Sequence, residues 1–169
     1  SVAKMGAKHI VITSVDRDDL IDGGASIWAA TVRAIRKHAP GVTMETLIPD
    51  FQGKKEQLDF ILSVNPEVVS HNLETVERLS RKVRIQAQYD RSLDVLLYLK
   101  ENGIQRTKSG IMLGLGETEE ELYEALDKLR EAKVDIVTLG QYLQPTRKHL
   151  EVQKYITPEE FERYREVAL

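Results

Sequence analysis

Short apolar runs alternate strictly with helical patterns along this chain, and this alternation constrains the fold more than any other feature. Several of these runs are continuous apolar stretches, which is typical of strands buried on both faces. Their starts recur roughly every 30 residues, the length of a βα unit. The sequence predicts strands at residues 9–13, 42–48, 67–70, 106–113 and 134–139.

Helical spacing of apolar residues fills the segments between these runs. A strict β–α alternation implies a parallel sheet, either doubly wound or curled into a barrel. Five units are too few for a closed eight-unit barrel of about 250 residues. The fold class expected is therefore α/β, a partial TIM-like barrel of about five βα units in a single domain, residues 1–169. The predicted helices are 24–38, 54–64, 73–83, 93–101 with a cap at Ser92, 119–132, and a last one opened by Thr157 and Pro158.

Composition excludes several classes of function. Hydrophobic residues make up 41% and charged residues 30% of the 169, as in a globular domain, and the net charge of −3 argues against nucleic-acid binding. No apolar run approaches membrane-spanning length. The chain has no cysteine, so it offers no thiolate to a metal or an iron–sulfur cluster. It begins at Ser1 and ends in a helical pattern, so we expect a piece cut from a longer protein.

Polar residues follow every predicted strand at its carboxyl end, the edge where parallel α/β folds bind ligands. One tract stands out, at residues 107–118, where a strand ends in a glycine turn that leads directly into an acidic helix. Thr118 and Glu121 form a capping box there, and the free N–H groups of such a turn suit an anion. Glu45 and Lys108 lie inside apolar strands, where an unpaired charge is costly. The residues at these ends include Thr13, Ser14, Asp16, Asp50, His71, Asn72, Glu74, Gly114, Gly116, Glu117 and Gln141.

Each of these residues also has a purely structural interpretation. Asp16 fits a solvated loop, and His71 fits a core histidine with both ring nitrogens satisfied. Asn72 and Glu74 are suitable caps for the helix that follows them. Lys108 fits an ion pair with a neighbouring acid.

Several segments together carry a resemblance to one known family. They are residues 11–25, 49–51, 71–76, 89–93, 107–117 and 140–145, and they run in order through nearly the whole chain. The sequence resembles the lipoyl synthases, which are radical S-adenosylmethionine (SAM) enzymes built on a partial (β/α)6 barrel.

The resemblance implies insertion of two sulfur atoms at C6 and C8 of an octanoyl chain, which is held on a lysine of a lipoyl carrier domain. One 4Fe–4S cluster cleaves SAM to a 5′-deoxyadenosyl radical, and a second cluster is consumed as the sulfur source. The implied partners are the octanoylated carrier domain and a reductant such as ferredoxin or flavodoxin, with no nucleic acid and no membrane. The implied location is the cytoplasm of a bacterium or, in a eukaryote, the mitochondrion.

The chain departs from this family in one large respect. The family's two cysteine triplets and its C-terminal serine ligand are absent, and Gln52 stands where the family usually has arginine. Because thiolates are the ligands that such clusters need, we expect the middle of the enzyme, without the first βα unit and the tail. This piece alone should hold no metal ligand and no catalytic residue, and should be inactive.

The resemblance also implies roles at the strand ends. The methionine amino group of SAM maps near Thr13 and Asp16, its ribose and carboxylate near Asn72 and Glu74, and its adenine near residues 110–117. Lys108 and Arg91 are candidate partners for the SAM carboxylate or another anion. The residues predicted to bind the cofactor are Thr13, Ser14, Asp16, Asn72, Glu74, Arg91, Lys108, Gly114, Gly116, Glu117 and Gln141.

Two other functions remain open at this point. A lysine on a strand at a barrel mouth is a possible Schiff-base nucleophile, so an aldolase using Lys108 is one alternative. The other is a cysteine-free scaffold that only binds SAM or the carrier domain.

Overall fold

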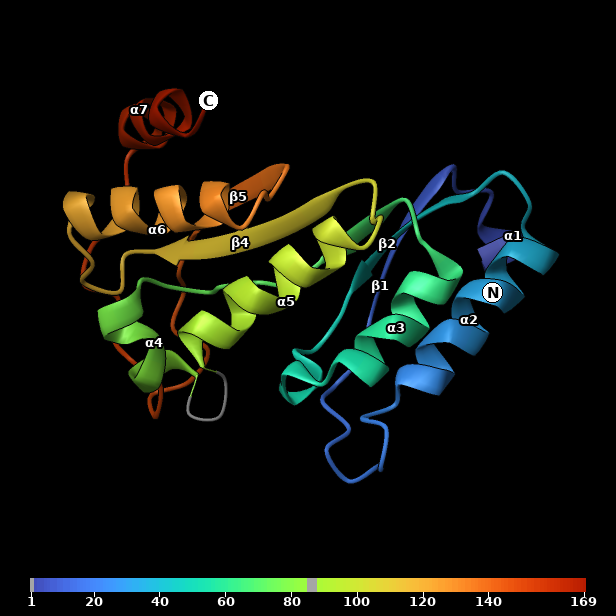
Figure 1. Cartoon of the computed structure of the whole chain (residues 1–169). Coiled ribbons are helices and arrows are strands. Elements are labelled where there is room, and N and C mark those ends of the chain that lie inside the picture. The colour runs from blue at the N-terminus through green and yellow to red at the C-terminus, as the bar shows by residue number, and fades with distance from the viewer. Residues whose placement is uncertain (1, 85–87) are drawn as a thin grey trace.

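The structure, a computed structural model, describes residues 2–84 and 88–169 and shows a curved parallel sheet with helices along one side (Figure 1). Strands and helices alternate as the sequence predicts. In chain order the elements are α1 (Val2–Met5), β1 (His9–Thr13), α2 (Ala25–His38), β2 (Thr43–Leu47), the short 3-10 helix η1 (Phe51–Gly53), α3 (Lys55–Val64), β3 (Val68–Ser70), α4 (Glu77–Val83), α5 (Tyr89–Glu101), β4 (Thr107–Leu113), α6 (Glu119–Glu131), β5 (Ile136–Gln141) and α7 (Pro158–Ala168).

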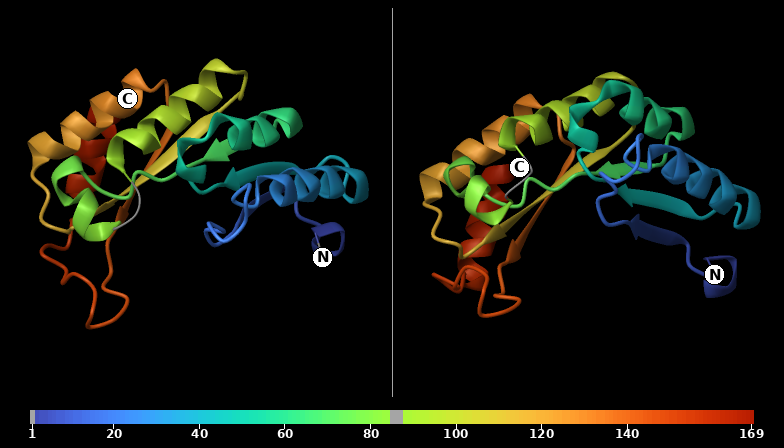
Figure 2. Two further views of the ribbon diagram at one scale, coloured as in Figure 1. Left: turned by 60° about the horizontal axis from the view of Figure 1, so that its bottom comes forward. Right: turned by 90° about the horizontal axis from the view of Figure 1, so that it is seen from below.

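The strands lie in the sheet in their chain order, from β1 at one edge to β5 at the other, and all neighbours are parallel. Each crossover therefore moves one strand in the same direction. Right-handed crossovers of this kind place their helices on one face of the sheet, and Figure 2 shows α2, α3, α5 and α6 along the same side. This is the arrangement of a partial barrel. A doubly wound sheet is excluded, because its strand order would reverse at a switch point.

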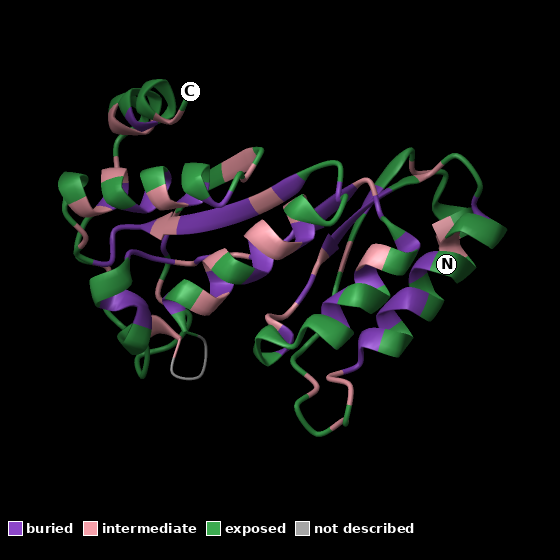
Figure 3. Cartoon of the chain, viewed as in Figure 1, coloured by how far each residue is buried: buried purple, intermediate pink, exposed green. Residues whose placement is uncertain are grey.

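The two faces of the sheet differ in what they contact. Ile111 and Leu113 of β4 pack into a hydrophobic cluster with α5 and α6 and are at most 2% exposed (Figure 3). Successive side chains of a strand point to opposite faces. Lys108, Gly110 and Met112 therefore face the side that these helices leave uncovered. We call that side the open face.

The predicted strands are all present among the described residues. The first has the predicted bounds, and the others differ by one or two residues at their ends. The predicted helix starts are less accurate in two places. Ser92 does not cap a helix, because α5 already begins at Tyr89, and Ser92 is buried inside it.

The other correction concerns the segment after β3. A helix was expected from residue 73, but Glu74 pairs with β4 in an isolated parallel bridge instead. The amide of Glu74 donates to the carbonyl of Gly110, and the amide of Met112 donates to the carbonyl of Glu74. Helix α4 begins only at Glu77, and its N-cap residue is Val76, so neither Asn72 nor Glu74 caps it.

The predicted capping box of Thr118 and Glu121 is confirmed at the start of α6. The predicted start of the last helix at Thr157 and Pro158 is also confirmed, and Thr157 forms a second capping box there with Glu160. These short-range patterns place two helix starts correctly because the donors and acceptors lie within three residues of each other. In the part of the chain that is described, no helix is both long and apolar enough to cross a membrane.

Candidate functional site

Three polar side chains meet on the open face across β2, β3 and β4. The ammonium of Lys108 lies 3.0 and 3.1 Å from the two carboxylate oxygens of Glu45, and the hydroxyl of Ser70 donates to one of these oxygens at 2.7 Å. Glu45 and Ser70 are 7% and 1% exposed. The expected ion pair of Lys108 with an acid is therefore present. It would have to break before Lys108 could bind a SAM carboxylate or attack a carbonyl as an aldolase.

Asn72 and Glu74 lie together at the end of β3, on the rim of the open face. The side-chain amide of Asn72 donates to the carboxylate of Glu74 at 3.2 Å. A Cβ atom at Gly110 would lie 3.0 Å from the Asn72 side-chain oxygen and 3.1 Å from the Thr138 hydroxyl oxygen. The missing side chain at Gly110 thus leaves room for the amide to lie across β4. Glu74 has φ of 70°, in the left-handed region that few residues other than glycine adopt.

A buried hydrogen-bond network holds the backbone of this rim. His71 is 2% exposed, with Nδ1 3.0 Å from the Ile48 carbonyl and Nε2 2.9 Å from the Ser92 hydroxyl. A carbonyl only accepts, so Nδ1 carries the proton and Nε2 accepts from Ser92. Nη1 of Arg84 donates to the Asn72 carbonyl at 2.8 Å and to Ser92 at 3.2 Å. His71 is thus the satisfied core histidine of the structural interpretation, and the network ties Asn72 to α5.

Burial lowers the pKa of His71 from its ordinary value of 6.5 to about 4. The unfolded chain therefore takes up a proton more readily than the folded chain between these values. The stabilising contribution is complete above pH 6.5 and is lost as the pH falls toward 4, about 3 kcal/mol in all.

Urea unfolding between pH 7 and pH 4.5 measures this effect. In His71→Asn, which keeps a donor for the Ile48 carbonyl but cannot titrate there, the free energy of unfolding should fall less steeply with acid. His38→Asn, an exposed position at the end of α2, is the matched control. Equal slopes for the wild type and His71→Asn would contradict this account.

The glycine turn after β4 is already occupied by an anion of the chain itself. The carboxylate of Glu117 accepts from the backbone N–H of Gly114 at 2.6 Å and from that of Leu115 at 2.9 Å. The start of α6 is closed by its capping box. The structure therefore differs from the expected open anion site, because these N–H groups have partners within the chain.

A long connection from β5 to α7, residues 142–157, crosses this turn, and we call it the strap. The amide of Gln153 donates to the Gly114 carbonyl at 2.8 Å. Gln141 fastens the strap from β5, since its side-chain nitrogen donates to the Lys154 carbonyl at 3.2 Å and its oxygen accepts from the Ile156 amide at 2.8 Å. Gln141, predicted to bind the cofactor, thus uses both ends of its amide to hold the chain.

Residues at the end of β1 line a small cavity away from Asn72 and Glu74. Thr13 and Ser14 border a space of about 200 Å³ between β1 and α2, beside Trp28 and Gly24. The Thr13 hydroxyl donates to the Leu47 carbonyl at 3.2 Å. Asp16 is exposed in the following loop, as its structural interpretation expects.

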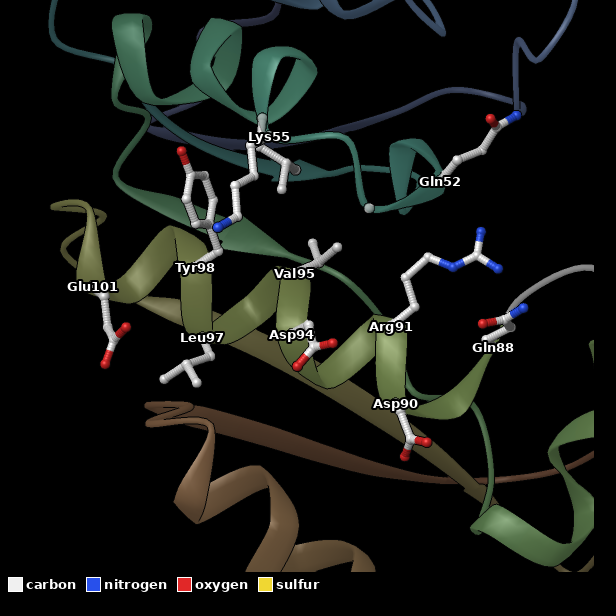
Figure 4. A pocket seen from close by; sticks show the side chains of 12 residues that line it. Gln52, Lys55, Gln88, Asp90, Arg91, Asp94, Val95, Leu97, Tyr98 and Glu101 are labelled. Atoms are coloured by element: carbon white, nitrogen blue, oxygen red, sulfur yellow. The ribbon is translucent and has the colours of Figure 1, made fainter.

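Arg91 lies in the helix layer. It borders a cavity of about 600 Å³ between α3 and α5, and Figure 4 shows its guanidinium extending toward Gln52. Its Nη1 is 3.4 Å from the Asp50 carboxylate, and its stem packs on Gly53. The structure therefore brings Asn72 and Glu74 together but places Arg91 with a different set of neighbours.

Arg84 is the polar residue at this site that sequence reasoning missed. No strand precedes it directly, and it follows α4 in a run of basic residues, so nothing in the local pattern separates it from solvated charge. Only its contacts with Asn72 and Ser92 reveal its place. Among the described residues, no group of three or more His, Cys, Asp or Glu side chains is arranged to hold a metal ion.

Comparison with known proteins adds to this geometry. The model of the radical SAM superfamily matches residues 1–129. The chain is 66% identical over 169 residues to lipoyl synthase of Flavobacterium johnsoniae, covering 100% of this chain and 59% of the relative. It is 65% identical over 168 residues to the mitochondrial lipoyl synthase of Nematostella vectensis, covering 99% and 58%. The chain thus spans less than two thirds of the length of these relatives.

Two solved structures share the fold at low identity. Coproporphyrinogen III oxidase from Escherichia coli, a radical SAM enzyme, superimposes with a TM-score of 0.67 and 13% identity, over 97% of this chain and 40% of that one. The radical SAM methyltransferase TsrM from Kitasatospora setae gives 0.60 and 14%, over 85% and 29%. Both are enzymes of the superfamily whose model matches the chain.

Proposed function

The chain belongs to the radical SAM superfamily, whose model matches residues 1–129, and from this premise we propose that it is the barrel core of a lipoyl synthase. The observation that carries the proposal is 66% identity to a lipoyl synthase along all 169 residues. The whole protein would insert sulfur at two carbons of an octanoyl chain held on a lysine of a carrier domain. A single-electron donor such as ferredoxin or flavodoxin would supply electrons. Following the relatives, we place it in a bacterium or in a mitochondrion.

The residues at the end of β3 fit SAM. A carboxylate and an amide side by side, as in Glu74 and Asn72, suit the two hydroxyl groups of a ribose, which donate and accept hydrogen bonds. Within the described part of the chain, Nη1 of Arg84 makes both of its side-chain hydrogen bonds, so the planar guanidinium is held beside Asn72, where it can pair with the SAM carboxylate. When bound in the complete protein and cleaved by one electron, SAM would supply the radical that breaks unactivated C–H bonds.

Arg84 is a better candidate partner for the SAM carboxylate than Lys108 and Arg91, the two cations that the sequence suggested. Lys108 is paired with Glu45, and Arg91 is paired with Asp50. Binding an anion at either would cost the existing pair, whereas the contacts of Arg84 are to a neutral carbonyl and a hydroxyl. We therefore propose that Asn72, Glu74 and Arg84 orient SAM at the rim.

The clusters do not fit this chain. They need thiolate ligands, and the chain has no cysteine. We propose that their ligands belong to the part of the relatives' length that this chain does not span, and that this chain by itself is inactive. An aldolase is not favoured, because the candidate nucleophile Lys108 is held in its ion pair.

SAM affinity of the complete protein tests the proposed roles. Asn72→Ala and Glu74→Gln should each weaken binding by about 1–3 kcal/mol, because a polar group is left without its partner. Arg84→Lys should also weaken it, since a lysine cannot form a bidentate pair. Equilibrium binding by calorimetry measures the affinity. The matched control is Asn102→Ala, at an exposed residue behind α5. Affinities equal to that of the wild type in all three variants would refute these assignments.

A further inference from the structure

The strap has no helix or strand, yet its backbone is held at several points. The Tyr142 hydroxyl donates to the Leu150 carbonyl at 2.8 Å, and the Gln144 side chain donates to the His149 carbonyl at 2.7 Å. Gln141 and the Gly114 carbonyl fasten its other half. Its outward side chains are therefore presented on a defined backbone, which lowers the entropy cost of binding a partner.

Those outward side chains are of the kinds that protein interfaces use. Leu143 is 65% exposed and Tyr155 is 69% exposed. Scattered exposed apolar residues are normal, but these two lie on one fastened loop with Arg147 and Lys148 between them. Both cations are exposed, and within the described part of the chain neither forms an ion pair. Tyrosine and arginine are enriched among residues that dominate binding energy.

The strap also lies beside the proposed SAM site, at the carboxyl end of the sheet. It crosses the turn after β4, at the same end of the sheet as Asn72 and Glu74, and Figure 2 shows it projecting from that end near α4. Helix α4 contacts the same turn, because Arg78 donates to the Gly116 carbonyl, and α4 also exposes Arg81 and Lys82. Although the whole chain has a net charge of −3, this part of the rim exposes four cations, Arg81, Lys82, Arg147 and Lys148, that form no ion pair with the described residues.

We propose that the strap is the docking surface for an acidic protein domain. This is the carrier domain whose octanoyl-lysine reaches the proposed SAM site. This inference rests on the proposed function and names the surface that recognises its substrate. Carboxylates of the domain would face Arg147 and Lys148, and an apolar spot would cover Leu143 and Tyr155. A domain docked there holds its modified lysine next to the rim residues that orient SAM.

Binding kinetics of the complete enzyme with its purified octanoylated carrier domain test the proposal. The double variant Arg147→Glu with Lys148→Glu should lower the association rate about 10-fold and flatten its salt dependence, because charge steers the encounter. The double variant Leu143→Ser with Tyr155→Ser should raise the dissociation rate about 10-fold. The matched control is Arg33→Glu with Lys37→Glu, the same charge change at exposed positions on α2.

Turnover of a short octanoyl-lysine peptide separates this inference from the proposed function. The strap variants should act on the peptide like the wild type while losing turnover of the carrier domain. Wild-type binding and turnover of the carrier in both strap variants would overturn the docking surface and leave the proposed function standing. Binding of anionic vesicles in place of the carrier domain would also overturn it. A wild-type enzyme inactive on both substrates would remove the proposed function and the inference with it.

Discussion

Replacing Gly114 by alanine is expected to lower the free energy of unfolding by about 3 kcal/mol or more. Gly114 has φ of 100°, which strains any residue with a side chain. A Cβ atom there would lie 2.3 Å from the Lys154 carbonyl oxygen and 2.6 Å from the Gln141 side-chain nitrogen. Both atoms belong to the attachment of the strap, so relief of the clash must displace it. Urea unfolding measures the loss.

Gly41→Ala separates the clash from the backbone strain. Gly41 has φ of 91°, but nothing lies within 4 Å of a Cβ atom built on it. It should therefore show only the strain, about 1 kcal/mol. The difference between the two variants is the energetic cost of moving the strap. Equal losses in the free energy of unfolding at both positions would mean that the strap moves at no energetic cost. The inference that it holds its side chains rigidly would then be wrong.

Lys108→Met is expected to destabilise the protein by about 3 kcal/mol, because it leaves a charge unpaired in a partly buried place. The Glu45 side chain is 10% exposed and would keep only the Ser70 hydroxyl as a partner. Adding Glu45→Gln to Lys108→Met removes the charge but keeps an acceptor for Ser70. The double variant should therefore recover most of the lost stability.

A double-mutant cycle over Glu45 and Lys108, followed by urea unfolding, measures the coupling between the two side chains. A double variant no more stable than Lys108→Met would show that the pair does not set the cost. The same measurement bears on the aldolase alternative. An amine that is strongly coupled to a carboxylate is held away from nucleophilic attack.

The sequence alone determined the elements of this fold with good accuracy. Strand periodicity and the spacing of apolar residues are local, and the bounds of β1 were predicted without error. The capping boxes at Thr118 and Thr157 involve residues three apart, so such helix starts can be recognised without knowledge of the tertiary structure. The local pattern failed after β3, where Glu74 pairs with β4 and the helix begins only at Glu77.

Only the tertiary structure determined that the sheet forms a partial barrel and which partner each charged side chain has. Strand order separates a partial barrel from a doubly wound sheet, and it depends on pairing between distant segments. Position at a strand end predicted that Asn72 and Glu74 lie at the rim. It could not show that Lys108 pairs with Glu45, 63 residues away, or that Arg84 reaches the Asn72 carbonyl. A charge on a sequence has no partner until folding brings one within a few ångströms, because Coulomb and hydrogen-bond energies depend on that distance.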